Sequence, residues 1–261
     1  MNGNIMRFED ISLNVAGGVG RITVMRADRL NSMRSQTVAE IRIAVQCLEK
    51  NDDVKSVILT GDGRAFGAGY DLTTLPTEGT LPLDRVLDDY VNPLIRCIRQ
   101  SRLQIISAVN GPCAGASVGI ALSCDIVLAA STAYFYSPFV SIGLVPDAGC
   151  SLFMTNSIGR VRASASMLLG ERISANEALA WGLVWRVLED SEALMAFADK
   201  CATRLAGLSG FAVAATKRLI AAASNEHVDN QLKMERDLQI KASHTPEMQA
   251  GLAEFRKLRA R

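Results

Sequence analysis

The chain of 261 residues is 49% hydrophobic and 21% charged, a composition typical of a folded globular protein rather than a disordered one. Its 28 Lys and Arg residues nearly balance 27 Asp and Glu residues and form no basic run, which argues against nucleic acid or a membrane as a partner. Six scattered cysteines without a CxxC pair, and only two histidines, His227 and His244, do not fit a zinc motif. Such thiols, and a first segment without an apolar run, lead us to expect a cytoplasmic protein without a signal peptide.

The first part of the chain alternates short apolar runs with a helical stretch. Residues 11–15 and 21–25 have the composition of two strands joined by a glycine turn, which predicts a hairpin. Apolar residues at helical spacing predict a helix that begins near Ser35 and ends before Asn51.

The next segment combines a strand with a loop that is rich in glycine. A buried strand is expected at 57–60, and the glycine-rich loop follows at 61–70. Residues 77–83 are typical of a flexible connection, and 84–100 have the pattern of an amphipathic helix.

The middle of the chain is almost uncharged, since residues 103–146 carry one formal charge, Asp125. An Asn-Gly-Pro turn and later Ser and Pro residues interrupt this stretch, so it does not read as membrane spans. We expect a strand at 105–109, a helix of small residues at 115–123 and a strand at 126–129. This βαβ rhythm predicts parallel strands, with Asp125 as a buried structural carboxylate that is bonded to its neighbours.

After residue 150 the pattern is helical and rich in alanine. The apolar content is high for a monomer, so we expect some apolar surface to be buried between subunits. The predicted helices lie at about 160–169, 174–181, 190–207, 211–224, 229–243 and 246–259.

Five segments, read in order, resemble the crotonase (enoyl-CoA hydratase/isomerase) superfamily. They are residues 25–32 (MRADRLNS), 64–72 (RAFGAGYDL), 110–126 (beginning NGPCAGA), 143–149 (GLVPDAG) and 178–184 (ALAWGLV). They span nearly the whole chain without a large gap.

The resemblance implies an α/β fold of the crotonase type, a spiral of ββα turns with two near-perpendicular sheets. It also implies C-terminal helices that form a homotrimer, which in many members pairs into a hexamer. We therefore expect a core domain with the acyl-CoA site at 1–195 and a helical oligomerisation region at 196–261.

The same resemblance assigns an oxyanion site to the backbone N–H groups of Tyr70 and Ala116. Proton removal beside a thioester carbonyl places charge on its oxygen, and fixed donors aimed at that oxygen stabilise the charge. Small residues leave such donors unobstructed, and a helix N-terminus adds partial positive charge. Taken alone, the two segments also fit an ordinary turn and close packing; their order along the chain favours the oxyanion site.

Further contacts to the acyl-CoA thioester follow from the family comparison. The adenine is expected against the backbone from Ala65 to Ala68, and Arg29 is either a phosphate contact or a solvated surface residue. No metal or redox cofactor is expected, because CoA is part of the substrate and no ligand cluster occurs. The full expected set is Arg29, Ala65, Ala68, Gly69, Tyr70, Asp71, Leu72, Gly115, Phe139 and Leu144, with Asp71 also bonded within its own loop.

The choice of reaction depends on the carboxylates. Hydratases of this family use two glutamates to activate water, and the corresponding positions here are Gly119 and Phe139, which offer no acid or base. The remaining acid is Asp147, and several family members that isomerise acyl-CoA thioesters place a carboxylate there. Burial should raise its pKa and strengthen it as a base. Its local sequence also fits the N-cap of a helix from Ala148.

We therefore expect an isomerase in which Asp147 shuttles a proton, against two alternatives. One is a hydratase, decarboxylase or hydrolase that uses another acid or a tyrosine such as Tyr136. The other is a catalytically silent acyl-CoA-binding protein. A dehalogenase would need a histidine nearer the middle of the chain than His227 and His244. Residues 73–95 show no pattern that converts into an acyl preference.

Overall fold

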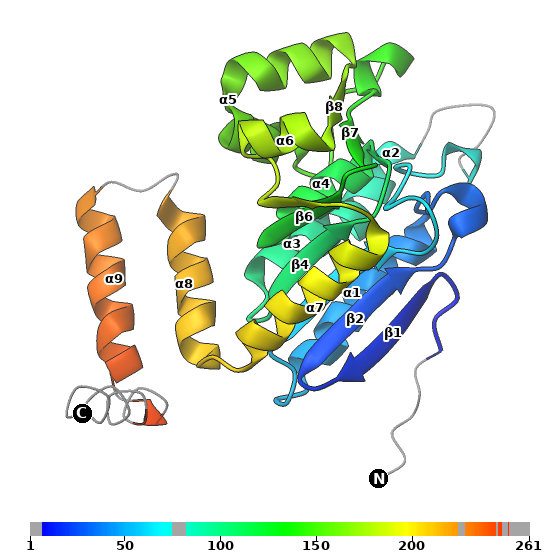
Figure 1. Ribbon diagram of the computed structural model, residues 1–261. Coiled ribbons are helices and arrows are strands. Elements are labelled where there is room, and N and C mark those ends of the chain that lie inside the picture. Colours follow the sequence, from blue (N-terminus) through cyan, green and yellow to red (C-terminus); the bar gives the residue numbers. More distant parts are fainter. Residues whose placement is uncertain (1–6, 75–81, 224–227, 244, 247–249, 251–261) are drawn as a thin grey trace.

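The computed structural model describes residues 7–74, 82–223, 228–243, 245–246 and 250. Its main sheet has the strand order β1-β2-β3-β4-β6-β9, in which only the β1–β2 pair is antiparallel (Figure 1). This confirms the predicted hairpin and the parallel strands. The strands are β1 (Ile11–Ala16), β2 (Val19–Val24), β3 (Ser56–Gly61), β4 (Gln104–Val109), β6 (Ile126–Ala130) and β9 (Arg186–Leu188).

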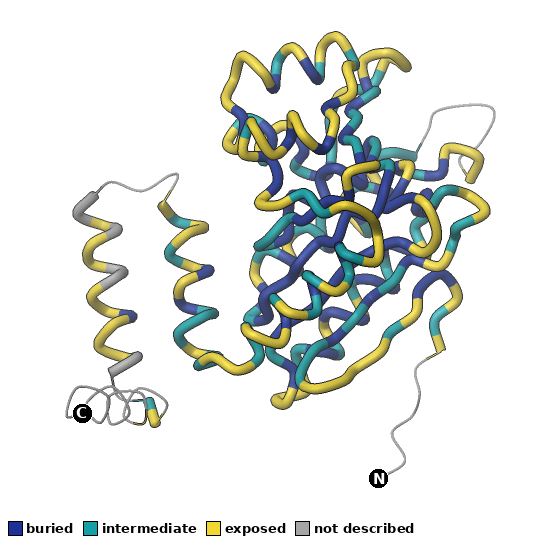
Figure 2. The backbone as a smooth tube through the Cα atoms, viewed as in Figure 1, coloured by how far each residue is buried: buried dark blue, intermediate teal, exposed yellow. Residues whose placement is uncertain are grey.

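The central strands are buried on both faces, as parallel strands between helix layers require. Every residue of β3 and of β4 is buried (Figure 2). Alternate side chains of these strands point to opposite faces: Val57 and Leu59 pack in one apolar cluster, whereas Ile58 packs in the other. The first cluster includes apolar residues of α1 (Ser35–Glu49) and α3 (Asn92–Gln100), and the second those of α7 (Ser191–Ala206).

A smaller sheet with the order β5-β7-β8 lies beyond the end of the main one. The resemblance implies a second sheet, but its strands are too short to show a period and could not be located in the sequence. Helix α4, which leads out of β5, is buried along its whole length, as the run of small apolar residues predicts. These elements are β5 (Cys113–Ala114), β7 (Tyr134–Tyr136), β8 (Arg172–Ser174), α4 (Ala116–Ser123) and α6 (Ala175–Trp181).

Two predicted helices differ from the observed ones. Helix α5 (Cys150–Leu169) begins well before the expected residue 160, and Gly159 interrupts it with φ 77° and ψ 158°. The helix expected at 84–100 contains a π-helical segment, η3 (Val86–Val91), between α2 (Leu83–Arg85) and α3. Pro93 cannot donate a backbone hydrogen bond, and the Asn92 amide bonds to Leu87, five residues back, as in a π turn.

The C-terminal helices α8 (Gly210–Ala223) and α9 (Val228–Ser243) stand as a pair beside the sheet domain (Figure 1). The boundary expected between residues 195 and 196 falls inside α7, whose Ala198 and Ala202 are buried against the sheet. Within the described residues no single helix has the length and apolar character to cross a bilayer, although α7 and α8, bent by 111°, together pass that test by length and composition. The connection at 75–81 and most of the helix expected at 246–259 lie outside the described residues.

A buried ion pair links helix α8 to the main sheet. Lys217 Nζ lies 2.9 Å from Asp125 Oδ2 and also donates to the carbonyl oxygens of Ile98 and Leu103, at 2.9 and 3.0 Å. Asp125 Oδ2 additionally accepts the Ile105 amide at 2.8 Å. The structural role expected of Asp125 is confirmed.

Candidate active site

A cavity of about 360 Å³ opens at the carboxyl end of β3, where the glycine-rich loop, the N-terminus of α4 and the segment 138–149 meet. Its wall is mostly apolar, and Asp147 is the one carboxylate among the described residues that line it. The η3 segment closes one side. The lining residues are Ala68, Gly69, Tyr70, Leu72, Leu83, Val86, Leu87, Val91, Asn92, Gly115, Ala116, Pro138, Phe139, Ile142, Leu144, Val145, Pro146, Asp147, Ala148 and Gly149.

The first candidate oxyanion donor is the Tyr70 amide. The Gly69 carbonyl in the same peptide unit accepts the Met33 amide at 2.8 Å. Because the N–H and C=O of a trans peptide point in opposite directions, this bond turns the Tyr70 N–H away from Met33. Among the described residues that N–H has no acceptor, and Tyr70 lines the cavity. The amide is therefore available to a ligand.

The second candidate donor is the Ala116 amide, at the first residue of α4. The Gly115 carbonyl of the same peptide accepts the Val118 amide at 3.0 Å, so the Ala116 N–H points out of the helix N-terminus. Both residues line the cavity. The aligned peptide dipoles of α4 add partial positive charge at this end.

Close backbone contact holds the two donor segments together. Gly69 has φ +94°, which favours glycine, and a Cβ there would lie 3.1 Å from the Ala114 carbonyl oxygen. The Gly69 amide donates to Ser117 Oγ at 3.1 Å, and Ser117 is completely buried. A single side chain of α4 thus bonds to the loop that carries Tyr70.

Asp147 lines this cavity and has one carboxylate oxygen without a partner. Its Oδ1 atom is buried and has no hydrogen-bond partner among the described residues. Burial raises the pKa of Asp147 to about 6, against a smaller lowering effect of its own backbone amide. Helix α5 begins at Cys150, and no side chain caps it; Asp147 contributes only its carbonyl oxygen, which accepts the Cys150 amide at 2.8 Å. One carboxylate oxygen of this cavity-lining residue is therefore left without a partner.

The two positions that would carry the hydratase glutamates are occupied differently. Phe139 is buried and lines the cavity. At Gly119 the Ala148 backbone fills the space in front of the Cα atom. Neither position supplies a group that could hold a water molecule.

The structure brings the predicted site residues together with three exceptions. Arg29 is exposed on the surface, where its Nε lies 3.6 Å from Asp28 Oδ2. Ala65 is buried, and its carbonyl accepts Asn31 Nδ2 at 2.6 Å. The Asp71 carboxylate bonds to Thr73 Oγ1 at 2.6 Å, which confirms its expected role within the loop.

Tyr136 is not among the described residues that line the cavity. The Tyr136 ring lies 5.4 Å from the Arg172 guanidinium, and its carbonyl accepts the Gly115 amide at 2.8 Å. His227 and His244 fall outside the described residues. Within the described ranges, no three His, Cys, Asp or Glu side chains gather as metal ligands would.

Several supporting residues could not be identified from the sequence. Asn31 is fully buried and ties two loops together, since its Nδ2 donates to Asp62 and Ala65 and its Oδ1 accepts the Arg26 amide. Arg26, in turn, bonds to Asp71. These contacts join residues that are far apart in the chain, and the only signal was the presence of Arg26 and Asn31 in a matching segment.

Comparison with known proteins agrees with this geometry. A family model described as enoyl-CoA hydratase/isomerase matches residues 14–260. The chain is 36% identical over 250 residues to the 1,2-epoxyphenylacetyl-CoA isomerase of Escherichia coli (strain K12), with 95% of each chain covered. It is 32% identical over 250 residues to a probable enoyl-CoA hydratase of Rhodobacter capsulatus, with 96% of each covered. A crystal structure of enoyl-CoA hydratase subunit I from Geobacillus kaustophilus matches with a TM-score of 0.89 at 32% identity, covering 96% of each chain.

Proposed function

Because this chain belongs to the enoyl-CoA hydratase/isomerase family, we propose that it is an acyl-CoA isomerase in which Asp147 shuttles a proton. The observation that carries the proposal is the combination around one cavity of Asp147, whose Oδ1 has no partner, with two backbone amides that have no acceptor among the described residues. Family members act on CoA thioesters, and a double-bond shift needs only one group that takes and returns a proton.

The proposed reaction begins with proton transfer from C2 of a 3-enoyl thioester to the Asp147 carboxylate. The C–H electron pair moves into the dienolate, and the charge on the thioester oxygen is stabilised by the Tyr70 and Ala116 amides. Each such donor is worth roughly 3 kcal/mol where it has been measured. Asp147 then returns the proton to C4, which gives the 2-enoyl thioester. The step is redox-neutral and adds no atom.

The apolar wall supports this chemistry in two ways. It keeps water away from the dienolate, so that Asp147 rather than solvent returns the proton. It also raises the pKa of Asp147 to about 6, which brings its basicity closer to the operating pH of a general base. A ring epoxide of an arylacetyl thioester, the substrate type in the name of the Escherichia coli relative, would use the same oxyanion site for a ring rearrangement.

The CoA moiety is proposed to lie against the backbone from Ala65 to Ala68, with Arg29 near its phosphates. Ala68 is exposed at the cavity mouth, and Arg29 is exposed on the neighbouring loop. The proposed reaction uses no metal or redox cofactor. We also propose that the protein is located in the cytoplasm.

We also propose that the chain forms a homotrimer, or a hexamer as a dimer of trimers. The support is the apolar surface of α5, where four large side chains are more than half exposed. Burial of such a surface between subunits would stabilise an assembly. These residues are Leu152, Val161, Leu168 and Leu169.

Product analysis tests the proposal. The protein is incubated separately with 3-enoyl-, 2-enoyl- and ring-epoxide CoA thioesters, and products are identified by mass and ultraviolet absorbance. We expect a product of unchanged mass with the absorbance of a conjugated thioester or a rearranged ring. Gain of the mass of water, or loss of a carboxyl group, would identify a hydratase or a decarboxylase instead. Tight binding without turnover of any substrate would identify a silent acyl-CoA-binding protein.

A further inference from the structure

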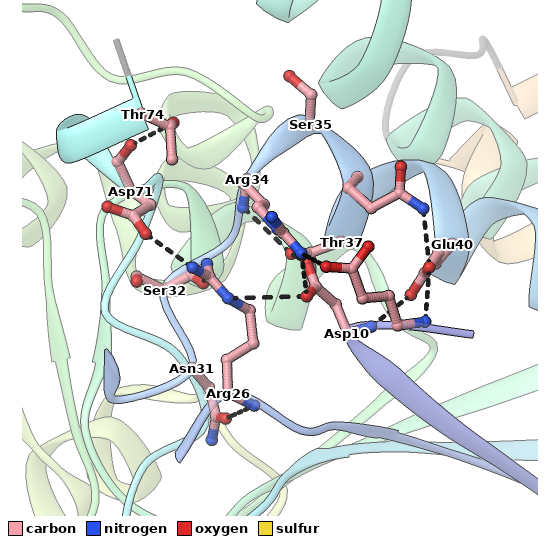
Figure 3. Close-up of polar contacts among 12 residues, drawn as sticks. Asp10, Arg26, Asn31, Ser32, Arg34, Ser35, Thr37, Glu40, Asp71 and Thr74 are labelled. Carbon is pink, nitrogen blue, oxygen red and sulfur yellow. Dashed lines mark hydrogen bonds and ion pairs between the residues drawn. The ribbon is translucent and has the colours of Figure 1, made fainter. Parts of the chain in front are cut away.

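We propose that Arg26 is a positioning residue that aims the Tyr70 amide at the thioester oxygen. Met33 and Tyr70 form an isolated parallel β-bridge, and this bridge fixes the direction of the Tyr70 N–H. The Arg26 guanidinium bonds to a residue adjacent to each bridge partner (Figure 3). The proposal rests on the proposed function only because both use the same oxyanion amide.

The guanidinium spans the two strands of the bridge. Arg26 Nη1 donates to the carbonyl oxygen of Ser32, which precedes Met33. Arg26 Nη2 donates to Asp71 Oδ2 at 2.9 Å, and Asp71 follows Tyr70. Because the guanidinium is planar and rigid, it fixes the spacing between the two chain segments, and none of Arg26, Ser32 and Asp71 is among the described residues that line the cavity.

The bridge itself transmits this spacing to the amide. The Met33 amide donates to Gly69, and the Met33 carbonyl accepts the Asp71 amide, both at 2.8 Å. The peptides on both sides of Tyr70 are therefore held by one residue. If the loop that carries Asp71 moves away from Ser32, the Gly69–Tyr70 peptide tilts and the N–H direction changes with it.

Arg26 also forms an ion pair with a second carboxylate, that of Asp10. Arg26 Nε lies 3.8 Å from Asp10 Oδ1. Asp10 also accepts Arg34 Nε at 2.8 Å and Thr37 Oγ1 at 2.5 Å. Burial acts to raise the pKa of Asp10, but the bonds from Arg34 and Thr37 hold it below its usual value, so this carboxylate stays ionised at neutral pH.

The Asp10, Arg26 and Asp71 side chains, which we call the relay, are largely shielded from water. The side chains of Asp10, Arg26 and Asp71 are 5%, 15% and 8% exposed. Burial likewise acts to raise the pKa of Asp71, and the bonds from Thr73 and Arg26 outweigh it and hold that pKa low. Ion pairs in such surroundings are geometrically strict, because either partner left alone would be a buried, unpaired charge.

Arg34 provides the matched control. It binds the same Asp10 carboxylate through Nε and Nη2, both at 2.8 Å, and makes no contact with the loop from Gly69 to Asp71. Arg34→Met therefore removes a guanidinium of similar environment and leaves the Arg26 bonds to Ser32 and Asp71, which carry the proposal, in place.

The test measures carbonyl polarisation in a bound ligand that does not react. A saturated acyl-CoA with ¹³C at the thioester carbonyl is bound to wild type, Arg26→Met, Arg26→Lys, Asp71→Asn and Arg34→Met, and its infrared carbonyl band is recorded. Turnover of a 3-enoyl-CoA is measured in parallel. Removal of a whole oxyanion donor costs about 10²–10³ in kcat, so misdirection of one is expected to cost roughly tenfold to a hundredfold.

In wild type we expect the carbonyl band of the bound ligand to lie at lower frequency than that of the free ligand. Arg26→Met and Asp71→Asn are expected to lose most of this downward shift and to lower kcat, with KM within threefold of wild type. Arg26→Lys, which keeps the charge, is expected to recover part of both, and Arg34→Met to retain the wild-type band. A wild-type band in folded Arg26→Met or Asp71→Asn, or no band shift in wild type, would overturn the proposal. A normal set of band shifts without isomerase activity would instead overturn the proposed function alone.

Discussion

The Ala148 carbonyl oxygen fills the space in front of Gly119: a Cβ atom on residue 119 would lie 2.3 Å from that oxygen and 2.7 Å from Ala148 Cβ. Ala148 adjoins Asp147 and has φ 51°, a conformation that few residues other than glycine adopt. The chain can therefore place Asp147 where it does only because residue 119 has no side chain. A hydratase glutamate at 119 and this path of the chain at Asp147 exclude each other.

Gly119→Ala should consequently lower both stability and turnover. The added methyl group overpacks a rigid backbone contact, which costs typically 1–3 kcal/mol in the free energy of unfolding, and relief of the clash displaces Ala148 and its neighbour Asp147. Urea unfolding and 3-enoyl-CoA turnover measure the two effects. Gly207→Ala is the control, because the nearest atom to its Cβ lies at 3.6 Å. Equal behaviour of the two variants would refute the packing argument.

Turnover should rise with pH through the pKa of Asp147. As a base, Asp147 acts only when ionised, and burial raises its pKa to about 6. Below that value kcat/KM is expected to fall about tenfold per pH unit, and above it to level off. Initial rates of 3-enoyl-CoA isomerisation between pH 4.5 and 8.5 give the profile, with protein unfolding followed in parallel. An activity that is constant down to pH 4.5 would show that this carboxylate is not the base.

The same raised pKa predicts that Asp147 destabilises the fold at neutral pH. The folded-state pKa of about 6 exceeds the ordinary value of 3.8, so the folded protein binds the proton more tightly than the unfolded chain. Stability from this group is complete below the ordinary value and is lost as pH rises through about 6. Asp147→Asn should therefore have a free energy of unfolding on the order of 1–2 kcal/mol above that of wild type at pH 7.5, after allowance for residual solvent, and should unfold at a higher temperature.

The sign of this difference is the informative result. At pH 4 most Asp147 is protonated in the folded state, and the two proteins should unfold at similar temperatures. Calorimetry at both pH values decides the matter. A variant that is less stable than wild type at pH 7.5 would mean that Asp147 makes a stabilising contact as a carboxylate.

Loss of the buried partner of Asp125 should detach helix α8. Lys217→Met leaves the Asp125 carboxylate without the ammonium 2.9 Å away, and breaking a buried pair in this way costs about 3–5 kcal/mol. Combination with Asp125→Asn removes the unpaired charge and should recover much of that loss. Urea unfolding of both variants tests this. A double variant no more stable than Lys217→Met would show that the charge is not the cause.

The main sheet was predictable because its strands are long enough to show their character. Val57–Thr60 and Ile105–Val109 are continuous apolar runs between turn residues, and such runs form buried parallel strands. The strands of the small sheet are two or three residues long and carry no period. The π-helical segment before Pro93 could not be predicted from the helix propensities of its residues either. It depends on how the backbone hydrogen bonds of this one helix are arranged.

Within the site, sequence reasoning found the groups that line the cavity better than those that support them. Tyr70, Ala116, Phe139 and Asp147 were expected at the cavity, and all line it. The support from Ser117 and Arg26 was not expected, since each acts on a segment that is brought close only by folding. Asp71 illustrates the difference: its local bond to Thr73 was expected, and its ion pair with Arg26 was not.

The central claim is that one carboxylate moves the proton, and Asp147→Asn tests it most directly. The variant keeps the shape of the side chain but cannot accept a proton from C2. Conversion of 3-enoyl-CoA to 2-enoyl-CoA, followed at the absorbance of the conjugated thioester under single-turnover conditions, should slow by about 10²–10⁴. The Kd for a saturated acyl-CoA should stay within threefold of wild type. A rate within tenfold of wild type in the folded variant would contradict the account.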